Sequence, residues 1–219
     1  MKLLLHTCCA PCSVYCIKSL RAEGIEPTLY WYNPNIHPYA EYKARRDCLK
    51  KYAEIVGVEL IIDDAYGLDE FCCQVANRLE TRCETYCYPL RLQRAAQYAF
   101  DHGFDAISTT LLYSIYQKHD IIKQLLSEYA VTQGIEFLYR DFRAGWQEGQ
   151  DAARQIGLYM QKYCGCVFSE EESGFGRELG RKMQKRGLSP TNANVRRVIE
   201  VNKSDDGFVV PAQLRQSLS

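Results

Sequence analysis

The sequence has no excess of charge of either sign, since 27 Lys and Arg residues balance 27 Asp and Glu residues. Overall charge therefore identifies no partner, and an anionic ligand needs a local basic patch. The sequence also lacks a long apolar run: none approaches the roughly 18 residues that span a bilayer. The apolar run at residues 1–6 is too short for a signal peptide. We expect a cytoplasmic protein with no membrane partner.

Glycine is absent from residues 7–12, the turn after the first predicted strand. Enzymes that cradle phosphate at such a turn use glycine to expose backbone N–H groups. The turn contains three cysteines instead, Cys8, Cys9 and Cys12, around Pro11. This composition favours chemistry based on sulfur over phosphate binding.

The composition, 47% hydrophobic and 25% charged, is enough for a folded core. We expect one catalytic domain over residues 1–176, followed by a partly ordered basic extension over residues 177–219. Residues 177–197 contain seven basic residues and one acidic residue, Glu178. Lys182, Lys185 and Arg186 in this stretch are candidates for binding tRNA phosphates, although a solvated helix face has the same composition.

Apolar and β-branched runs alternate with helical periodicity along most of the chain. The predicted strands are 2–6, 28–32, 58–62, 105–109 and 135–139, and the predicted helices are 13–24, 39–56, 68–79, 89–102, 118–129 and 147–160. Such alternation predicts an α/β fold, a parallel sheet with helices on both faces. Ligands bind beyond the carboxyl ends of parallel strands, and Cys8 and Cys9 follow the first strand directly.

Eleven cysteines, an odd number, cannot all pair within one chain. In a cytosolic protein, clustered cysteines more often bind metal or perform redox chemistry than form structural disulfides. Two pairs, Cys8 with Cys9 and Cys83 with Cys87, provide the four sulfur ligands typical of iron–sulfur clusters or structural zinc. Their expected position at the active-site edge favours iron.

A third cysteine cluster is Cys164-Gly165-Cys166. The single glycine between the two thiols permits a strained, easily reduced disulfide, which favours a redox-active pair. The alternatives are two further metal ligands or two idle thiols. Four other cysteines fall within predicted helices and are expected to be packing residues: Cys16, Cys48, Cys72 and Cys73.

Four motifs, in this order, resemble the cobalamin-independent epoxyqueuosine reductases, the QueH family, over residues 2–175. The motifs are His6-Thr7-Cys8-Cys9-Ala10-Pro11-Cys12; Arg82-Cys83 with Cys87-Tyr88-Pro89-Leu90-Arg91-Leu92; Thr109-Thr110-Leu111-Leu112 with Ser114, Tyr116, Gln117 and His119; and Tyr163-Cys164-Gly165-Cys166-Val167-Phe168-Ser169.

The resemblance implies a nucleotide-hydrolase, PP-loop-like (HUP-type) fold and reduction of the epoxide of epoxyqueuosine to the alkene of queuosine. The substrate would be tRNA with epoxyqueuosine at the wobble position of GUN anticodons, and the electron donor is not identified. The resemblance also implies its site residues: Cys8, Cys9, Cys83 and Cys87 hold a [4Fe-4S] cluster, Cys164 and Cys166 form the redox-active disulfide, and Cys12 is the candidate ligand of an adjacent mononuclear metal ion.

Loss of the epoxide oxygen as water requires a proton donor near the sheet edge. Tyr116, His119 and Asp64 are the candidate catalytic acids, on position alone; an ordinary hydrogen-bonding role is the alternative for each. Two other functions remain open. One is a zinc-stabilised RNA-binding module, and the other is a PP-loop-type tRNA thiolation enzyme, which the turn without glycine disfavours.

Overall fold

A computed structural model describes residues 1–175, 177–178 and 181–182. Its centre is a five-stranded sheet in the order β3-β2-β1-β4-β5, and all four strand pairs are parallel. The strands are β1 (Leu3–His6), β2 (Pro27–Trp31), β3 (Leu60–Ile62), β4 (Ala106–Thr109) and β5 (Glu136–Phe137). This doubly wound order places a topological switch point between β1 and β4, where the chain turns to opposite sides of the sheet.

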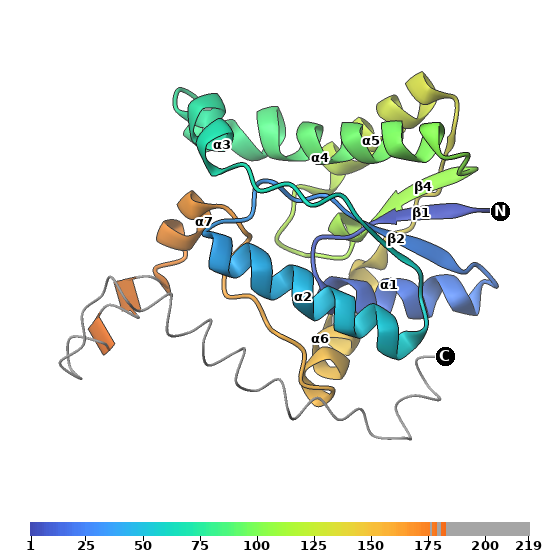
Figure 1. Ribbon diagram of the computed structural model, residues 1–219, viewed down its shortest axis with the longest axis horizontal. Helices are drawn as coiled ribbons and strands as arrows, with labels where there is room; N and C mark the ends of the chain where they lie inside the picture. The colour runs from blue at the N-terminus through green and yellow to red at the C-terminus, as the bar shows by residue number, and fades with distance from the viewer. Residues whose placement is uncertain (176, 179–180, 183–219) are drawn as a thin grey trace.

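Helices cover both faces of the sheet, so the predicted fold class is confirmed (Figure 1). The helices are α1 (Ala10–Ala22), α2 (Tyr39–Val56), α3 (Leu68–Val75), α4 (Tyr88–Asp101), α5 (His119–Gln133), α6 (Trp146–Gln155) and α7 (Val167–Glu172). Helices α1, α2 and α6 lie on one face, and α4 and α5 lie on the other. None of the described helices is both long enough and apolar enough to cross a membrane.

Strand β1 lies at the centre of the sheet and is fully buried. Leu4 pairs with Thr28 on β2 and with Ile107 on β4, and Leu3, Leu4 and Leu5 are at most 1% exposed. A strand that is covered on both faces needs a continuous apolar sequence, which is the pattern of residues 3–5. The buried strand holds the turn that follows it rigidly at the sheet edge.

The start of α1 differs from the prediction. Ser13 is a residue type typical of an N-cap and stands at the start of the helix predicted at residues 13–24, but α1 begins at Ala10 with Cys9 at the N-cap position. Ser13 Oγ instead donates a hydrogen bond to Cys9 O at 2.9 Å. Pro11 fits the first turn, where no backbone N–H is required. The earlier start brings the cysteines of residues 8–12 into the first turn of the helix.

Other elements are shorter than predicted: the helix predicted at residues 68–79 ends at Val75, and the strand predicted at 135–139 spans only Glu136–Phe137. The strand expected from residue 58 begins at Leu60, because Val58 N donates to Ala53 O and still belongs to the end of α2. The helix expected to reach residue 160 ends at Gln155, and Gly157 follows with a positive φ of 74°. The chain after Gly157 is therefore free to return to the sheet edge as a loop.

Candidate metal and redox site

The candidate site lies at the switch point between β1 and β4. Cys8 is the second residue after β1, and its N–H donates to Thr110 Oγ1, just after β4, at 3.2 Å. On the other side of the turn, Asn33 Nδ2 donates to the carbonyl oxygen of Thr7 at 2.9 Å. Three loops that follow parallel strands thus hold the turn in place.

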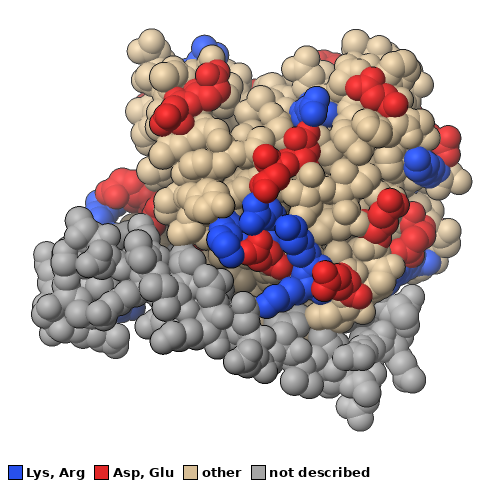
Figure 2. Space-filling model, in the orientation of Figure 1, with Lys and Arg blue, Asp and Glu red and all other residues tan. Residues whose placement is uncertain are grey.

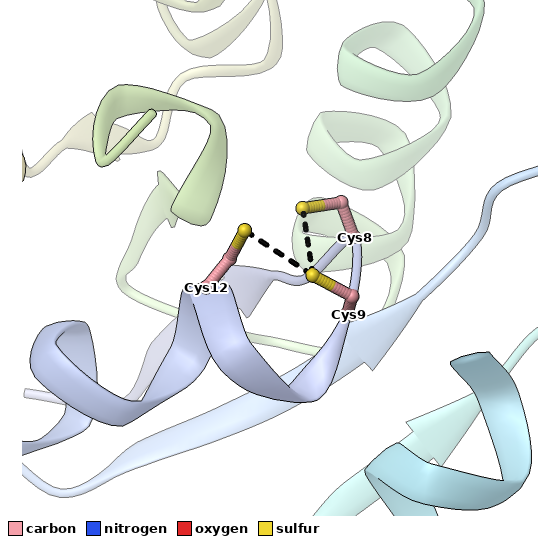
Figure 3. Close-up of side chains that lie close together, drawn as sticks. All are labelled: Cys8, Cys9 and Cys12. Atoms are coloured by element: carbon pink, nitrogen blue, oxygen red, sulfur yellow. Dashed lines mark hydrogen bonds between the residues drawn. The ribbon is translucent and has the colours of Figure 1, made fainter. Parts of the chain in front are cut away.

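Cys8, Cys9 and Cys12 form a compact thiol triad in this turn (Figure 3). The sulfur of Cys9 lies 3.8 Å from that of Cys8 and 3.2 Å from that of Cys12. All three sulfurs lie within 4.8 Å of one another. Cys9 and Cys12 are buried, whereas Cys8 is half-buried. Among the described residues, this is the only group of three or more His, Cys, Asp or Glu side chains close enough to hold one metal ion.

The three thiols have divergent acidities. Hydrogen bonds from Cys12 and Cys9 hold the pKa of Cys8 well below its ordinary value. Burial raises the pKa of Cys9, and the hydrogen bond with Cys8 raises that of Cys12. The contacts therefore favour the thiolate form of Cys8 and the protonated forms of Cys9 and Cys12, because further negative charge is unfavourable beside a thiolate. A bound cation removes this penalty, so the donor set fits a metal centre.

Cys83 and Cys87 form a second pair, on one π-helical turn, Cys83–Cys87, just before α4. The hydrogen bond from Cys87 lowers the pKa of Cys83, and the same contact raises the pKa of Cys87. As in the thiol triad, one sulfur is a thiolate that its neighbour stabilises. Both cysteines are thus arranged as a pair of soft ligands.

Arg91 connects the two groups of thiols. Its side chain is buried, and its Nε donates to Cys87 O at 2.9 Å. No ion pair joins it to a carboxylate in the described part of the chain. Its charge instead favours the thiolate form of four cysteines: Cys8, Cys83, Cys87 and Cys164. Cys8, Arg91 and Cys164 line one cavity, and Arg91 also donates to Cys87 O, so cysteines of three distant segments lie near this buried cation.

The four-thiol set Cys8, Cys9, Cys83 and Cys87 remains a prediction. Cys83 and Cys87 are not part of the compact group that includes Cys9 and Cys12. Each cysteine that holds a [4Fe-4S] cluster binds a different iron. The four cysteine sulfurs therefore lie farther apart than the sulfurs that bind one ion. The compact group of Cys8, Cys9 and Cys12 is close enough to hold a single ion, whereas the cluster requires Cys83 and Cys87 to approach Cys8 and Cys9 as well.

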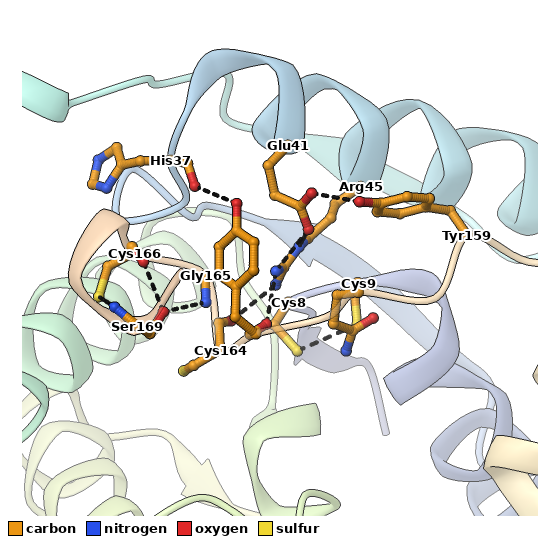
Figure 4. Close-up of polar contacts among 12 residues, drawn as sticks. Cys8, Cys9, His37, Glu41, Arg45, Tyr159, Cys164, Gly165, Cys166 and Ser169 are labelled. Carbon is orange, nitrogen blue, oxygen red and sulfur yellow. Dashed lines mark hydrogen bonds and ion pairs between the residues drawn. The ribbon is translucent and has the colours of Figure 1, made fainter. Parts of the chain in front are cut away.

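A buried arginine holds the Cys164-Gly165-Cys166 segment (Figure 4). Arg45 donates from Nη1 to Cys164 O and from Nη2 to Tyr163 O, both at 2.9 Å, and pairs with buried Glu41 at 2.9 Å. Gly165 has a φ of 156°, and a side chain there would meet Ile36 at 3.3 Å. A glycine between the two cysteines is therefore required by the backbone and by the close neighbour.

Cys164 and Cys166 are both free thiols in different surroundings. Cys164 is exposed, and its sulfur accepts a hydrogen bond from Gln117 Nε2 at 3.3 Å. Cys166 is buried beside Cys87 and Phe71, and its sulfur accepts from Ser169 N at 3.4 Å. The redox-active disulfide therefore remains a prediction. The packing of Cys166 beside Cys87 places the third cluster next to the second.

A cavity of about 410 Å³ opens beside these thiols. Its volume lies in the range of small-ligand sites. Its walls combine aromatic and amide side chains with two arginines and two of the thiol-triad cysteines. The residues that line the cavity include Cys8, Cys12, Arg45, Arg91, Tyr113, Tyr116, Gln117, Trp146, Gln150, Gln161, Lys162, Tyr163 and Cys164.

The structure separates the three candidate acids. Tyr116 lines the cavity and is 78% exposed, whereas Asp64 and His119 are not among the described lining residues. A hydrogen bond from Arg46 lowers the pKa of Asp64, so this carboxyl holds no proton to donate near neutral pH. Burial lowers the pKa of His119, whose Nε2 lies 3.1 Å from Tyr139 Oη. Tyr116 is the candidate that the geometry favours.

The three predicted tRNA contacts lie in or beyond the last described residues. Lys182 is exposed and pairs with Glu178 at 2.5 Å, whereas Lys185 and Arg186 lie outside the described residues. On the face shown in Figure 2, basic and acidic side chains of the described residues are interspersed. Among the described residues, Lys43 pairs with Asp47. This face therefore has no uniform cationic surface in its described part.

Three residues that touch the cysteine segments were not predicted from the sequence: Arg45, Gln117 as a thiol partner, and Gln161. Arg45 is one of several basic residues on α2 and has no local signal. Gln161 Nε2 lies 3.3 Å from Cys9 Sγ although 152 positions separate the two residues. Only the tertiary structure reveals contacts of this kind.

Comparison with known proteins identifies the family. The sequence matches the profile of the family described as "Epoxyqueuosine reductase QueH" over residues 3–172. The chain belongs to this family. This confirms the resemblance stated from the four motifs, and the match covers all three cysteine clusters.

Similar proteins of the QueH family occur in distant bacteria. The chain is 38% identical over 171 residues to an epoxyqueuosine reductase QueH of Dehalococcoides mccartyi, covering 78% of this chain and 93% of that protein. It is 35% identical to one of Haemophilus influenzae, covering 81% and 75% of the two chains. It is 33% identical to one of Thermotoga maritima, covering 76% and 88%.

One solved structure has a related outline. A predicted subunit of tRNA methyltransferase from Methanocaldococcus jannaschii matches with a TM-score of 0.46 and 13% identity, covering 89% of this chain and 92% of that chain. This likeness is too weak to support an argument. The fold assignment rests on the parallel strand order and the helices on both faces.

Proposed function

We propose that the protein is an iron–sulfur reductase that converts epoxyqueuosine to queuosine in tRNA. The observation that carries the proposal is a cavity lined by Cys8, Cys12 and Cys164 together with buried Arg91, whose Nε donates to Cys87 O. Perturbed thiols that converge on a cavity are typical of a redox site rather than of a structural knot. Membership of the QueH family supports the same reaction.

The proposed ligands of a [4Fe-4S] cluster are Cys8, Cys9, Cys83 and Cys87, and Cys12 is the proposed ligand of an adjacent metal ion. When bound, such a centre supplies one-electron transfer and a Lewis-acidic iron. The residues fit this group because their sulfurs are soft and partly ionised and lie near Arg91. The buried guanidinium offsets part of the negative charge of a thiolate-bound cluster.

The reaction balances with the third cysteine cluster. Removing the epoxide oxygen consumes two electrons and two protons and yields an alkene and water. Oxidation of the Cys164 and Cys166 thiols to one disulfide releases two electrons and two protons. An external reductant of the dithiol or one-electron class then restores the thiols.

Three side chains around the cavity have assigned roles in this proposal. Gln117 donates to Cys164 Sγ and accepts from Tyr88 Oη at 2.8 Å, which fixes the direction of its amide. Arg45 holds the backbone of Cys164. Tyr116 is placed to give a proton to the departing epoxide oxygen.

The proposed substrate is one splayed-out base of a tRNA anticodon loop, in the cytoplasm. Bases in single-stranded loops stack on aromatic side chains, and Tyr116 and Trp146 meet edge to face at the cavity with ring centroids 5.9 Å apart. Lys162 is exposed at the cavity and is placed to meet a phosphate. Lys182, Lys185 and Arg186 would add phosphate contacts from the extension. Neutralising these three should flatten the salt dependence of tRNA affinity.

The test is anaerobic purification with iron and zinc analysis, electron paramagnetic resonance and turnover of epoxyqueuosine tRNA. The wild-type protein should be brown and reducible, and Cys8→Ala and Cys87→Ala should lose iron and activity. Cys73→Ala is the matched control, because Cys73 is an exposed thiol on α3. Full iron and activity in Cys8→Ala or Cys87→Ala would refute the ligand assignment.

A second arm tests the dithiol. Cys164→Ser should keep its iron but lose turnover with the physiological reductant, because no disulfide forms from one thiol. Full turnover of this variant would remove the disulfide from the proposal. A colourless wild-type protein with stoichiometric zinc and no turnover would instead establish the zinc-stabilised RNA-binding module.

A further inference from the structure

Gln161 brings an amide group to the buried side of the thiol triad. It lies in the loop between α6 and α7 and lines the cavity. Its Nε2 is 3.3 Å from Cys9 Sγ and 3.9 Å from Cys12 Sγ. An N–H group at the shorter distance is within hydrogen-bonding range of a thiolate.

The other end of the amide shows how Gln161 is oriented. Its Oε1 is buried and has no hydrogen-bond partner among the described residues. No competing contact therefore turns the amide away from the two sulfurs. A metal-bound sulfur has no proton and only accepts hydrogen bonds, so the nitrogen must face it.

Two other glutamines line the same cavity and provide a comparison. Gln117 donates to the sulfur of Cys164, outside the proposed cluster ligands. Gln150 Nε2 donates to Tyr113 Oη at 3.4 Å, and no hydrogen bond within the described part of the chain joins it to a sulfur. Gln161 is thus the cavity glutamine that contacts a proposed cluster ligand, Cys9.

We propose that Gln161 is a positioning residue that donates an N–H hydrogen bond to Cys9 Sγ and thereby raises the reduction potential of the cluster. This inference rests on the proposed function. Reduction adds negative charge to the cluster and its sulfurs, so a hydrogen-bond donor stabilises the reduced state more than the oxidised state. Ligand partners of this kind tune metal centres without binding the metal.

The experiment measures the midpoint potential by electron paramagnetic resonance during redox titration of anaerobically purified protein. Gln161→Leu removes the donor, and Gln161→Glu keeps the shape but replaces the donor with an acceptor. We expect the midpoint potential of each variant to be more negative than that of the wild type. The expected change is about tenfold in the equilibrium constant for reduction, or about 59 mV for a one-electron couple. Gln150→Leu should leave the potential unchanged. The iron content of each variant distinguishes a shifted potential from a lost cluster.

The outcomes separate this inference from the proposed function. A wild-type potential in Gln161→Glu together with a shift in Gln161→Leu would show a packing role and overturn the inference. Wild-type potentials in both variants would overturn the inference alone, provided the wild-type centre is reducible and active. A wild-type protein without any reducible centre would overturn both.

Discussion

Replacing Arg45 with methionine should strongly destabilise the protein. The side chains of Arg45 and Glu41 are 2% and 5% exposed and pair at 2.9 Å. Removing one partner of a buried ion pair costs about 3–5 kcal/mol, because the buried Glu41 carboxylate then loses the opposite charge of the guanidinium. Two backbone carbonyls, of Tyr163 and Cys164, also lose their donors, at about 1–3 kcal/mol each where they stay buried. These costs are not additive, and we expect at least about 3 kcal/mol in total.

The assay is urea unfolding followed by circular dichroism, on proteins of matched metal content because bound metal stabilises the folded state. Arg46→Met is the control on the same helix. Its partner Asp64 is 51% exposed, so we expect a loss of at most about 1 kcal/mol. The double substitution Glu41→Gln with Arg45→Met should be less damaging than Arg45→Met, since the side chain at position 41 then carries no buried charge.

Arg45→Met should also change the redox segment. Without the guanidinium, the backbone of Cys164 loses its anchor on α2, and alkylation of the Cys164 thiol should change in rate relative to wild type. A free energy of unfolding for Arg45→Met within about 1 kcal/mol of that for Arg46→Met would refute the reasoning. Such a result would mean that water reaches the ion pair between Arg45 and Glu41 in solution.

Three further predictions concern other parts of the molecule. Burial lowers the pKa of His6 to about 4, so the fold requires neutral imidazole. The contribution of His6 to stability should be complete above about pH 6.5 and should fall by up to about 3 kcal/mol as the pH drops towards 4. His6→Gln should flatten this pH dependence in urea unfolding. Gly145→Ala would place a methyl group 2.0 Å from the Tyr15 ring and should lower the unfolding free energy by about 1–3 kcal/mol, with recovery in the double variant with Tyr15→Leu. Lys162→Gln should reduce the salt slope of tRNA binding by about 1, and Tyr116→Ala should weaken tRNA binding by about 1–3 kcal/mol through lost stacking. Both effects are measured by fluorescence anisotropy. An unchanged salt slope or affinity would remove the substituted residue from the RNA interface.

Local patterns predicted the long elements well because their signals are local. The helix predicted at residues 39–56 is α2, Tyr39–Val56, since its amphipathic pattern and Gly57, with a φ of 67°, are both visible in the sequence. The boundaries were less well predicted than the elements themselves. Ser13 had the residue type of an N-cap, but the helix starts at Ala10 because the turn from β1 already orients its first residues.

The candidate site divides in the same way. Clustering along the chain identified the thiols of Cys8, Cys9 and Cys12, and spacing identified Cys83 with Cys87. The proton donors were proposed on strand order alone, and the structure disfavours Asp64 because a salt bridge with Arg46 keeps it ionised. A carboxylate at a strand end looks the same in sequence whether or not a cation meets it.

The sequence by itself determined that the protein is a parallel α/β fold with three cysteine clusters, because strand alternation, helical periodicity and cysteine spacing are properties of neighbouring residues. Only the tertiary structure decided that Arg91 lies among those clusters and that Gln161 reaches Cys9. Arg91 is more than 70 positions from Cys8 and Cys164, and Gln161 is 152 positions from Cys9. Such long-range contacts depend on how the helices pack on the sheet. How the helices pack depends on how side chains from the whole core fit together, and a local sequence pattern carries no information about that fit.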